Sequence, residues 1–259
     1  MIKRIKGYLW NLHVEFLSAM LKERNFSAKN TVRRILIYHD INRRSLRSFK
    51  EQIRYYKDNF KVVSLSNFIG YLATDKNPDM NVLCLTFDDA YRSIYENAVP
   101  VLDEYDIKPC IFVPVGFIEA ESKYNYIKNN IKSEIVDDCM NWEELRKIIK
   151  KGYEVGSHSF SHVNFNSADI NYEYELSQSK SELELKLGID IKYFAFPFGN
   201  RDSFSEESLS RVREYGYLKA FSGIRKNVLN NDFLLPRTYI NPKWKLNAIR
   251  GMLSGHFDN

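Results

Sequence analysis

The residues Thr86-Phe87-Asp88-Asp89 end an apolar run, Val82 to Leu85, and they decide how the chain is interpreted. The run has the length and composition of a buried strand, and two carboxylates follow it directly. Adjacent side chains of an extended chain point to opposite faces, so one aspartate can bind a metal while the other stays free as a base. Paired aspartates are also common in turns and helix N-caps, so the pattern alone leaves both interpretations open.

A second polar cluster, His158-Ser159-Phe160-Ser161-His162, lies farther along the chain. A His-x-x-x-His spacing on a helical turn would place both imidazoles on one side, within reach of one ion. Chance occurrences on solvated helices have the same spacing. The chain has only five histidines, however, and both clusters stand where an apolar run gives way to polar residues. Sites of α/β proteins form at such strand ends, so the two clusters together predict a metal-dependent hydrolase.

Apolar runs alternate with helix-like stretches along most of the chain. Seven runs have the character of strands: 33–39, 82–88, 109–115, 153–158, 193–198, 217–222 and 234–240. The helix-like stretches are 45–58, 91–105, 141–151, 169–187 and 204–215. Asn141 and Glu144 form a capping-box pattern, and Ser203 or Ser205 is expected to cap the last of these helices. The alternation predicts an α/β fold with a parallel sheet, and the length suits one barrel domain.

Composition restricts the expected partners and the expected compartment of the protein. The 259 residues carry a net charge of +5 without a basic stripe, so nucleic acid is not an expected partner. Two of the three cysteines, Cys84 and Cys110, fall inside predicted strands, and Cys139 is the third. Buried thiols are expected rather than disulfides, which suits a reducing compartment. There is no signal peptide pattern and no run long enough to span a membrane, so we expect a cytoplasmic protein.

The N-terminal segment, residues 1–30, is expected to be a helix outside the catalytic barrel, which would occupy residues 31–259. Its apolar residues recur at helical spacing: Ile2, Ile5, Leu9, Leu12, Phe16 and Met20. Basic residues flank this stripe, so the helix is expected either to contact the inner membrane surface peripherally or to pack on the barrel or a second subunit. Residues 118–140 lack periodicity and are interpreted as an insertion near the mouth of the site.

Three motifs taken together resemble the polysaccharide deacetylases, carbohydrate esterase family four. They are Thr-Phe-Asp-Asp at 86–89, His-Ser-x-x-His at 158–162 and Phe-Ala-Phe-Pro-Phe-Gly at 194–199. The resemblance spans roughly residues 33–240. The run 35–40 is similar to the first strand of one branch of the family, which deacetylates the N-acetylglucosamine of exopolysaccharides. This branch is the group of enzymes that resemble poly-N-acetylglucosamine or chitooligosaccharide deacetylases. The resemblance implies a distorted, incomplete (β/α)7 barrel, similar to a TIM barrel, and metal-dependent removal of acetyl groups from amino sugars.

The resemblance also implies roles for the motif residues. Asp89, His158 and His162 would bind the ion, and Asp88 would be the general base. Many relatives place an arginine beside this base two residues before the proline of the third motif, but that position is Ala195 here. Arg237, at the end of the last predicted strand, is the expected substitute. The alternative is that Arg237 is an ordinary surface residue without a role in the site.

Four further residues complete the predicted site, and Pro197, Phe198 and His39 are expected to form its oxyanion and substrate-binding part. The backbone N–H of Phe198, just after Pro197, would stabilise the oxyanion, as the resemblance implies. Family members protonate the leaving amine with a histidine near the chain end, and His256 is the candidate, although its spacing departs from the family pattern. His39 is expected to line the substrate pocket.

The expected cofactor is one divalent ion, zinc first, with nickel, cobalt, iron or manganese as alternatives. The expected substrate is an acetylated amino-sugar glycan or its lipid-linked oligosaccharide precursor in surface polysaccharide biosynthesis, with N- or O-acetyl groups removed. Two other classes share part of the pattern. One is a non-haem iron oxygenase with two histidines and one carboxylate, and the other is a catalytically silent carbohydrate-binding protein on the same barrel.

Overall fold

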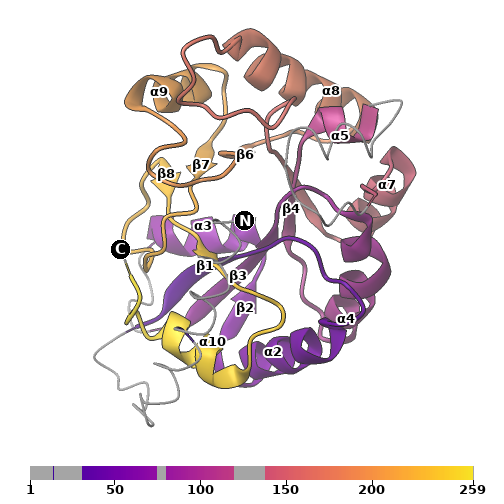
Figure 1. The fold of residues 1–259 in the computed structure, drawn as a ribbon, viewed down its shortest axis with the longest axis vertical. Coiled ribbons are helices and arrows are strands. Elements are labelled where there is room, and N and C mark those ends of the chain that lie inside the picture. The colour runs from indigo at the N-terminus through magenta and orange to yellow at the C-terminus, as the bar shows by residue number, and fades with distance from the viewer. Residues whose placement is uncertain (1–13, 15–30, 75–79, 120–137, 259) are drawn as a thin grey trace, which may run out of the picture.

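The computed structural model describes residue 14 and residues 31–74, 80–119 and 138–258. Within them the strands form one parallel sheet that curls into an incomplete (β/α)7 barrel, as predicted (Figure 1). The strands in chain order are β1 (Arg33–Tyr38), β2 (Lys61–Val63), β3 (Val82–Phe87), β4 (Cys110–Val113), β5 (Glu154–Ser157), β6 (Tyr193–Ala195), β7 (Lys219–Phe221), β8 (Leu234–Leu235) and β9 (Thr238–Tyr239). Their order in the sheet is β8-β7-β6-β5-β4-β3-β1-β9, and β2 pairs with the first half of β3.

The helices form a ring around this sheet (Figure 1). They are α2 (Leu46–Asn59), α3 (Leu65–Thr74), α4 (Val99–Glu104), α5 (Val115–Glu119), α7 (Trp142–Lys150), α8 (Ser179–Leu187), α9 (Glu206–Glu214) and α10 (Leu246–Leu253), with π-helical segments η1 (Ile94–Ala98) and η2 (Glu173–Gln178) leading into α4 and α8. The capping box of Asn141 and Glu144 is present at α7, and Ser205 rather than Ser203 caps α9. These helices therefore start where their local sequence indicates.

The predicted strand 234–240 is split into two short strands that close the barrel. Its first half, β8, pairs with β7, whereas its second half, β9, pairs with β1. Pro236 and Arg237 stand between the two halves, at the point where the chain passes from one neighbour to the other. One segment thus borders both ends of the sheet. The sequence predicted a single strand here because the run is continuous, and the run itself does not show that the pairing partner changes at Pro236 and Arg237.

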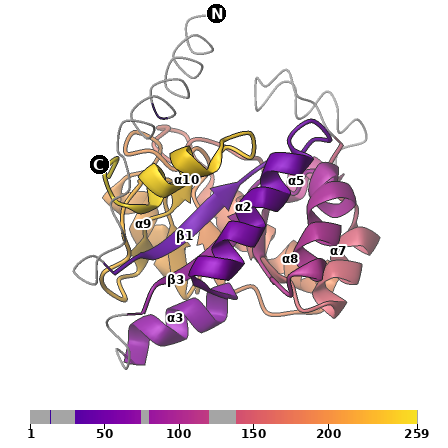
Figure 2. The ribbon, with the colours of Figure 1, turned by 90° about the horizontal axis from the view of Figure 1, so that it is seen from below.

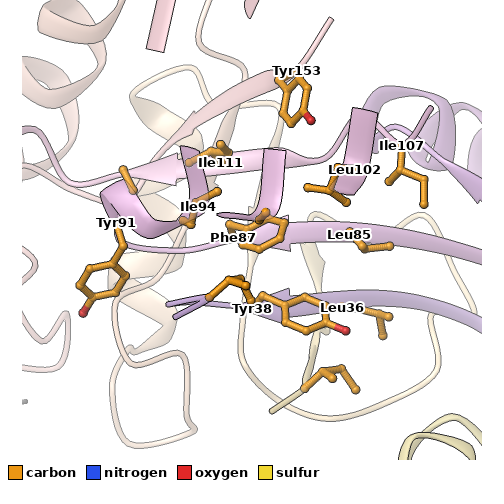
Figure 3. Packing of buried hydrophobic residues seen from close by; sticks show 14 of the residues in the cluster. Leu36, Tyr38, Leu85, Phe87, Tyr91, Ile94, Leu102, Ile107, Ile111 and Tyr153 are labelled. Carbon is orange, nitrogen blue, oxygen red and sulfur yellow. The ribbon is translucent and has the colours of Figure 1, made fainter. Parts of the chain in front are cut away.

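The two faces of the sheet bury different clusters. Side chains that point outward pack against the helices, as Leu36, Tyr38, Leu85 and Phe87 do beneath η1 and α4 (Figure 3). Side chains that point into the barrel alternate with them and form a second, smaller cluster around Ile35, Cys84, Cys110, Phe112 and Phe221. This alternation fixes which residues at the strand ends face the interior.

Helix α3, which was not predicted, closes the amino end of the barrel (Figure 2). Leu65 and Phe68 on its buried face pack against Ile35 and Val82 in the interior cluster. The cap of α3 comes from Glu154 on β5, whose carboxylate accepts the N–H groups of Leu65 (2.8 Å) and Ser66 (3.1 Å). With this end blocked, the interior is open at the carboxyl ends of the strands.

Other sequence expectations have mixed outcomes. Cys84, Cys110 and Cys139 are free and buried, as expected. Among the described residues, no helix is long and apolar enough to cross the bilayer. The N-terminal helix, apart from buried Val14, and most of the predicted insertion at 118–140 lie outside the described residues, so both remain predictions.

Candidate active site

A cavity of about 530 Å³ opens at the carboxyl ends of the strands. Its walls come from residues that follow β1, β3, β5, β6 and β7 and from β9 with the segment after it. His39, Asp88 and Arg237 continue the inward-facing rows of β1, β3 and the β8–β9 segment, respectively, because each stands two positions beyond another inward residue. The sheet's period of two therefore brings these three side chains to one place.

Asp88 and Arg237 form a bidentate ion pair at the base of the cavity. Arg237 Nη1 donates to Asp88 Oδ1 (2.7 Å), and Nη2 donates to Oδ2 (2.8 Å). Two further guanidinium N–H groups donate to the hydroxyl of Thr86 and the carbonyl of Ser222, and the guanidinium lies 4.9 Å from the centre of the Phe112 ring. The side chain of Arg237 is 1% exposed, so the predicted substitute arginine is a buried partner of the carboxylate and not a surface residue.

The pair determines the charge of Asp88. Burial by itself would raise the pKa of this carboxyl group, but the positive charge of Arg237 is the largest opposing cause, and the net effect is a pKa below the usual value. Asp88 is therefore ionised at neutral pH, although its side chain is only 6% exposed. A buried carboxylate kept ionised beside an open cavity is available to accept a proton.

Asp89 faces the same cavity, which corrects the expectation that the two aspartates diverge. The backbone at Asp89 and Ala90 is left-handed, with φ of 69° and 50°, so the extended alternation stops at Asp88. Asp89 Oδ1 lies 3.2 Å from His162 Nε2 and 3.7 Å from His158 Nε2. Burial again acts to raise the pKa of Asp89, and the nearby imidazoles more than offset it, which leaves this carboxyl group strongly acidic.

The two histidines are not on a helical turn, contrary to the prediction from their spacing. His158 directly follows β5, and the loop after it turns sharply through left-handed backbone at Ser159 (φ 67°) and His162 (φ 55°). Strain of this kind persists only where surrounding contacts hold it. Here the N–H of His162 donates to Ser159 Oγ (2.9 Å), so the turn is fixed in part by its own side chains.

Glu175 of η2 supplies further support for this loop, and it was not among the residues predicted for the site. Its Oε2 accepts the N–H groups of Phe160 (3.1 Å) and Ser161 (2.8 Å), and the residue is 4% exposed. Glu175 is therefore a positioning residue for His158 and His162. A signal does exist in hindsight, because an acidic residue on the buried side of a predicted amphipathic helix needs a partner.

Asp89, His158 and His162 fit a divalent ion. One ligand atom from each lies within 4.8 Å of the others, and all three residues are buried. His158 Nδ1 lies 2.7 Å from the carbonyl oxygen of Ala195, which can only accept, so Nδ1 carries the proton and Nε2 presents its lone pair to the cluster. Burial is the main cause that lowers the pKa of His158 to about 4, so this imidazole is neutral at physiological pH, as a metal ligand must be.

Phe198 lies on the cavity wall beside this cluster. Its ring is 52% exposed and stands 4.9 Å from that of His162, and its backbone is left-handed (φ 64°). Pro197 is buried behind it and does not line the cavity. Gly199 is required at the next position because a Cβ there would stand 2.4 Å from the backbone nitrogen of Gly223. The close approach of these two loops holds the Phe198 peptide at the cavity edge.

The structure brings His39 to the cavity but not His256. His39 Nδ1 is buried without a hydrogen-bond partner among the described residues, and the ring packs against that of Tyr239 at 5.8 Å. His256 is exposed on the turn after α10. Its neighbour Asp258 pairs with Arg34, near the amino end of β1, whereas the cavity lies beyond the carboxyl end of that strand. The position of His256 therefore does not suit the predicted proton donor.

With this geometry established, sequence comparison identifies the family. Residues 75–220, more than half of the chain, match the profile of the family described as polysaccharide deacetylase. The chain belongs to the polysaccharide deacetylase family. Family membership also sets aside the iron oxygenase interpretation, which rested on the two histidines and one carboxylate alone.

The sequence identity to individual members of this family is low. The chain is 26% identical over 205 residues to the poly-β-1,6-N-acetyl-D-glucosamine N-deacetylase of Staphylococcus aureus, a match that covers 74% of this chain and 66% of the relative. It thus spans just under two thirds of the length of that enzyme. Among solved structures, the Streptococcus pyogenes deacetylase PplD in complex with acetate has a TM-score of 0.70 at 19% identity and covers 86% and 99% of the two chains. IcaB of Ammonifex degensii has a TM-score of 0.65 at 22% identity, with coverage of 82% and 93%. Both structures share the fold.

Proposed function

We propose that this polysaccharide deacetylase is a metal-dependent hydrolase that removes N-acetyl groups from an amino-sugar glycan, in the first instance poly-β-1,6-N-acetylglucosamine. The observation that carries the proposal is the ionised Asp88, held by Arg237, within 3.9 Å of the metal-binding cluster at His158 Nε2. The named relative from S. aureus supports the choice of glycan. Zinc is the proposed ion, because two imidazoles and one carboxylate suit it and leave open coordination positions.

A bound divalent ion would supply Lewis acidity and make a water molecule more acidic. The residues of the chain perform the other steps. Asp88 takes the proton of the attacking water, and Arg237 keeps Asp88 ionised until then. The N–H of Phe198 lies at the cavity edge, where it donates to the oxygen that becomes negative as the amide carbonyl is attacked.

The C–N bond breaks only if the departing nitrogen receives a proton. We assign this step to His39, since it is the imidazole that lines the cavity and lies outside the metal-binding cluster. The products are then acetate and a glycan with a free amine, and the water's proton remains on Asp88 until it is released. His256→Ala should leave the rate unchanged within about twofold, whereas His39→Ala should lower it about 100-fold, the low end of general acid catalysis.

The direct test is hydrolysis by the metal-loaded full chain. Oligomers of β-1,6-linked N-acetylglucosamine, their β-1,4-linked counterparts and an O-acetylated sugar would be compared, with acetate and free amine measured separately. We expect equal amounts of acetate and free amine from the β-1,6-linked oligomers. Failure to release acetate from every substrate, with metal bound, would overturn the proposal and favour a carbohydrate-binding protein without activity.

A further inference from the structure

The part of the cavity wall formed by β9 carries an exposed aromatic ring. Tyr239 of β9 faces inward, two positions after Arg237, and is 41% exposed. Its ring is held edge-on by Trp244 at 6.1 Å and lies against His39 at 5.8 Å. An aromatic ring that is exposed on a cavity wall does not contribute the free energy that its full burial would supply. A ligand that covers the ring would gain that free energy on binding.

Asp40, one residue after His39, presents a carboxylate on the same wall. Oδ1 accepts from Ser93 Oγ (2.6 Å), and Oδ2 accepts from Asn42 Nδ2 (3.0 Å). Both partners are neutral, and no cation of the described chain forms an ion pair with Asp40. Each carboxylate oxygen can accept more than one hydrogen bond, so the fixed carboxylate keeps acceptor capacity toward the cavity.

Asp40 and Tyr239 are close enough to influence each other. The pKa of Tyr239 is raised to about 12, first by the loss of solvent around its hydroxyl group and then by the negative charge of Asp40. The hydroxyl therefore stays protonated and remains a donor across the working pH range. This wall offers a flat apolar ring, one O–H donor and one charged acceptor within a single small area.

These three groups match the two surfaces of a pyranose. One face of a sugar ring is a patch of C–H groups that packs on an aromatic ring, and its rim carries hydroxyl groups that pair with a carboxylate and a phenol. The cavity of about 530 Å³ lies within the range of about 300–1,000 Å³ for sites that enclose a drug-sized ligand. It therefore has room for more than the acetamido group that would lie at the metal-binding cluster.

We propose that Tyr239 and Asp40 form a subsite for the sugar unit next to the one that is deacetylated, so that the enzyme selects a chain of sugars over a single sugar. This inference rests on the proposed function, because it assumes that the cavity binds an amino-sugar glycan. The subsite recognises the ring and its hydroxyl groups and not the acetyl group. It lies beside β1 and β9, whereas the cluster of Asp89, His158 and His162 follows β3 and β5.

A ligand without an acetyl group separates the subsite from the activity. A β-1,6-linked glucose pentamer cannot be deacetylated, so its dissociation constant for the metal-loaded full chain can be measured by NMR titration whether or not the protein is an enzyme. Tyr239→Ala and Asp40→Asn should each weaken binding of the pentamer about fivefold, the effect of losing about 1 kcal/mol. Tyr239→Phe should retain most of the affinity that Tyr239→Ala loses, because it keeps the ring.

Leu185→Ala is the matched control, since it removes an apolar side chain that is 77% exposed on α8. It should bind the pentamer as the wild type does. On acetylated oligomers, Tyr239→Ala and Asp40→Asn should raise KM by a larger factor than they lower kcat, with metal content retained, and the loss of kcat/KM should be smaller for a single N-acetylglucosamine. Equal pentamer affinity in all these proteins, or no binding by the wild type, would overturn the subsite even if acetate release is observed.

Discussion

Two arginine–aspartate pairs, each with a buried arginine, stand near opposite ends of the barrel and have nearly the same geometry. Arg237 pairs with Asp88 at 2.7 and 2.8 Å, and Arg34 pairs with Asp258 at 2.8 Å through both oxygens. Each arginine side chain is 1% exposed. They even contact adjacent residues of the closing segment, because Arg34 Nη1 donates to Thr238 Oγ1 (3.1 Å), next to Arg237.

The pairs differ in what surrounds the carboxylate. Arg34 lies outside the sheet beneath α10, where its Nε donates to the carbonyl of Leu253 in the last turn of that helix. Its pair with Asp258 ties the C-terminal segment to β1. Arg237 points into the barrel, and its partner Asp88 faces the cavity and the metal-binding cluster. The Arg34–Asp258 pair, beneath helix α10, is thus structural. The Arg237–Asp88 pair has the same chemistry but borders an open site, where it controls the charge of a proton acceptor.

The largest expected difference between the two ends concerns metal. His158→Ala and His162→Ala should each reduce bound zinc from about one ion per chain to a small fraction and abolish deacetylation, because two ligands rarely hold the ion. Elemental analysis after gel filtration is the measurement, and His256→Ala is the matched histidine control. Equal metal content in all these proteins would remove the assignment of the cluster.

Arg34→Met should destabilise the fold by about 3 kcal/mol, the low end for breaking a buried pair, because Asp258 is 26% exposed and can turn to solvent. Methionine preserves the bulk of the side chain but not the charge. Chemical denaturation gives the free energy of unfolding, and kcat should stay at the wild-type value at a temperature where the variant is folded. A large loss of kcat in the folded variant would mean that the amino end is not merely structural.

Glu175→Ala should weaken metal binding about 10- to 100-fold, as expected for a residue that holds a ligand-bearing loop. Glu175→Gln should restore most of this loss, since its amide oxygen can still accept from Phe160 and Ser161. Competition with a zinc chelator measures the affinity independently of activity. If Glu175→Ala bound zinc as tightly as the wild type, Glu175 would not position the histidine loop.

Arg237→Ala should move the acid limb of the pH–rate profile to higher pH. The working form of Asp88 is ionised, so activity falls as pH drops through its pKa, and Arg237 lowers that pKa in the folded protein. Without the guanidinium, burial raises the pKa and the limb shifts upward. Arg237→Lys keeps one charge and should fall between the two profiles. An acid limb that does not move would show that Arg237 does not set the charge of Asp88.

Local patterns in the sequence predicted the barrel and most of the site, since apolar runs and their polar ends are encoded within a few residues. Contacts between distant residues account for the misses. Helix α3 has a weak local cap, since Ser64 Oγ accepts the N–H of Asn67 at 3.4 Å, and its shorter cap bonds come from Glu154, far along the chain. Helix α10 begins at Leu246, and its N-cap residue Lys245 makes no side-chain cap, so it has no local start signal. The left-handed turns at Ser159 and His162 depend on tertiary support, which spacing alone cannot reveal.

Arg237 and His256 show the same difference between local sequence signals and contacts of distant residues. Arg237 was chosen because it stands at the end of the last predicted strand, a feature of the local sequence, and in the structure it lies beside Asp88. His256 was chosen by its nearness to the chain end, but the turn that carries it is anchored by Asp258 to Arg34, 224 residues away in sequence. No pattern around His256 indicates that partner.

The most direct test of the central claim compares the two aspartates. Asp88→Asn and Asp258→Asn each leave a buried arginine without its counter-charge, so both should lose stability, which a matched denaturation curve would correct for. At a temperature where both are folded and metal-loaded, Asp88→Asn should lower kcat for acetate release at least about 100-fold, and Asp258→Asn should leave kcat within about twofold of the wild type. A kcat for Asp88→Asn within tenfold of the wild type, or equal losses in the two variants, would contradict the account.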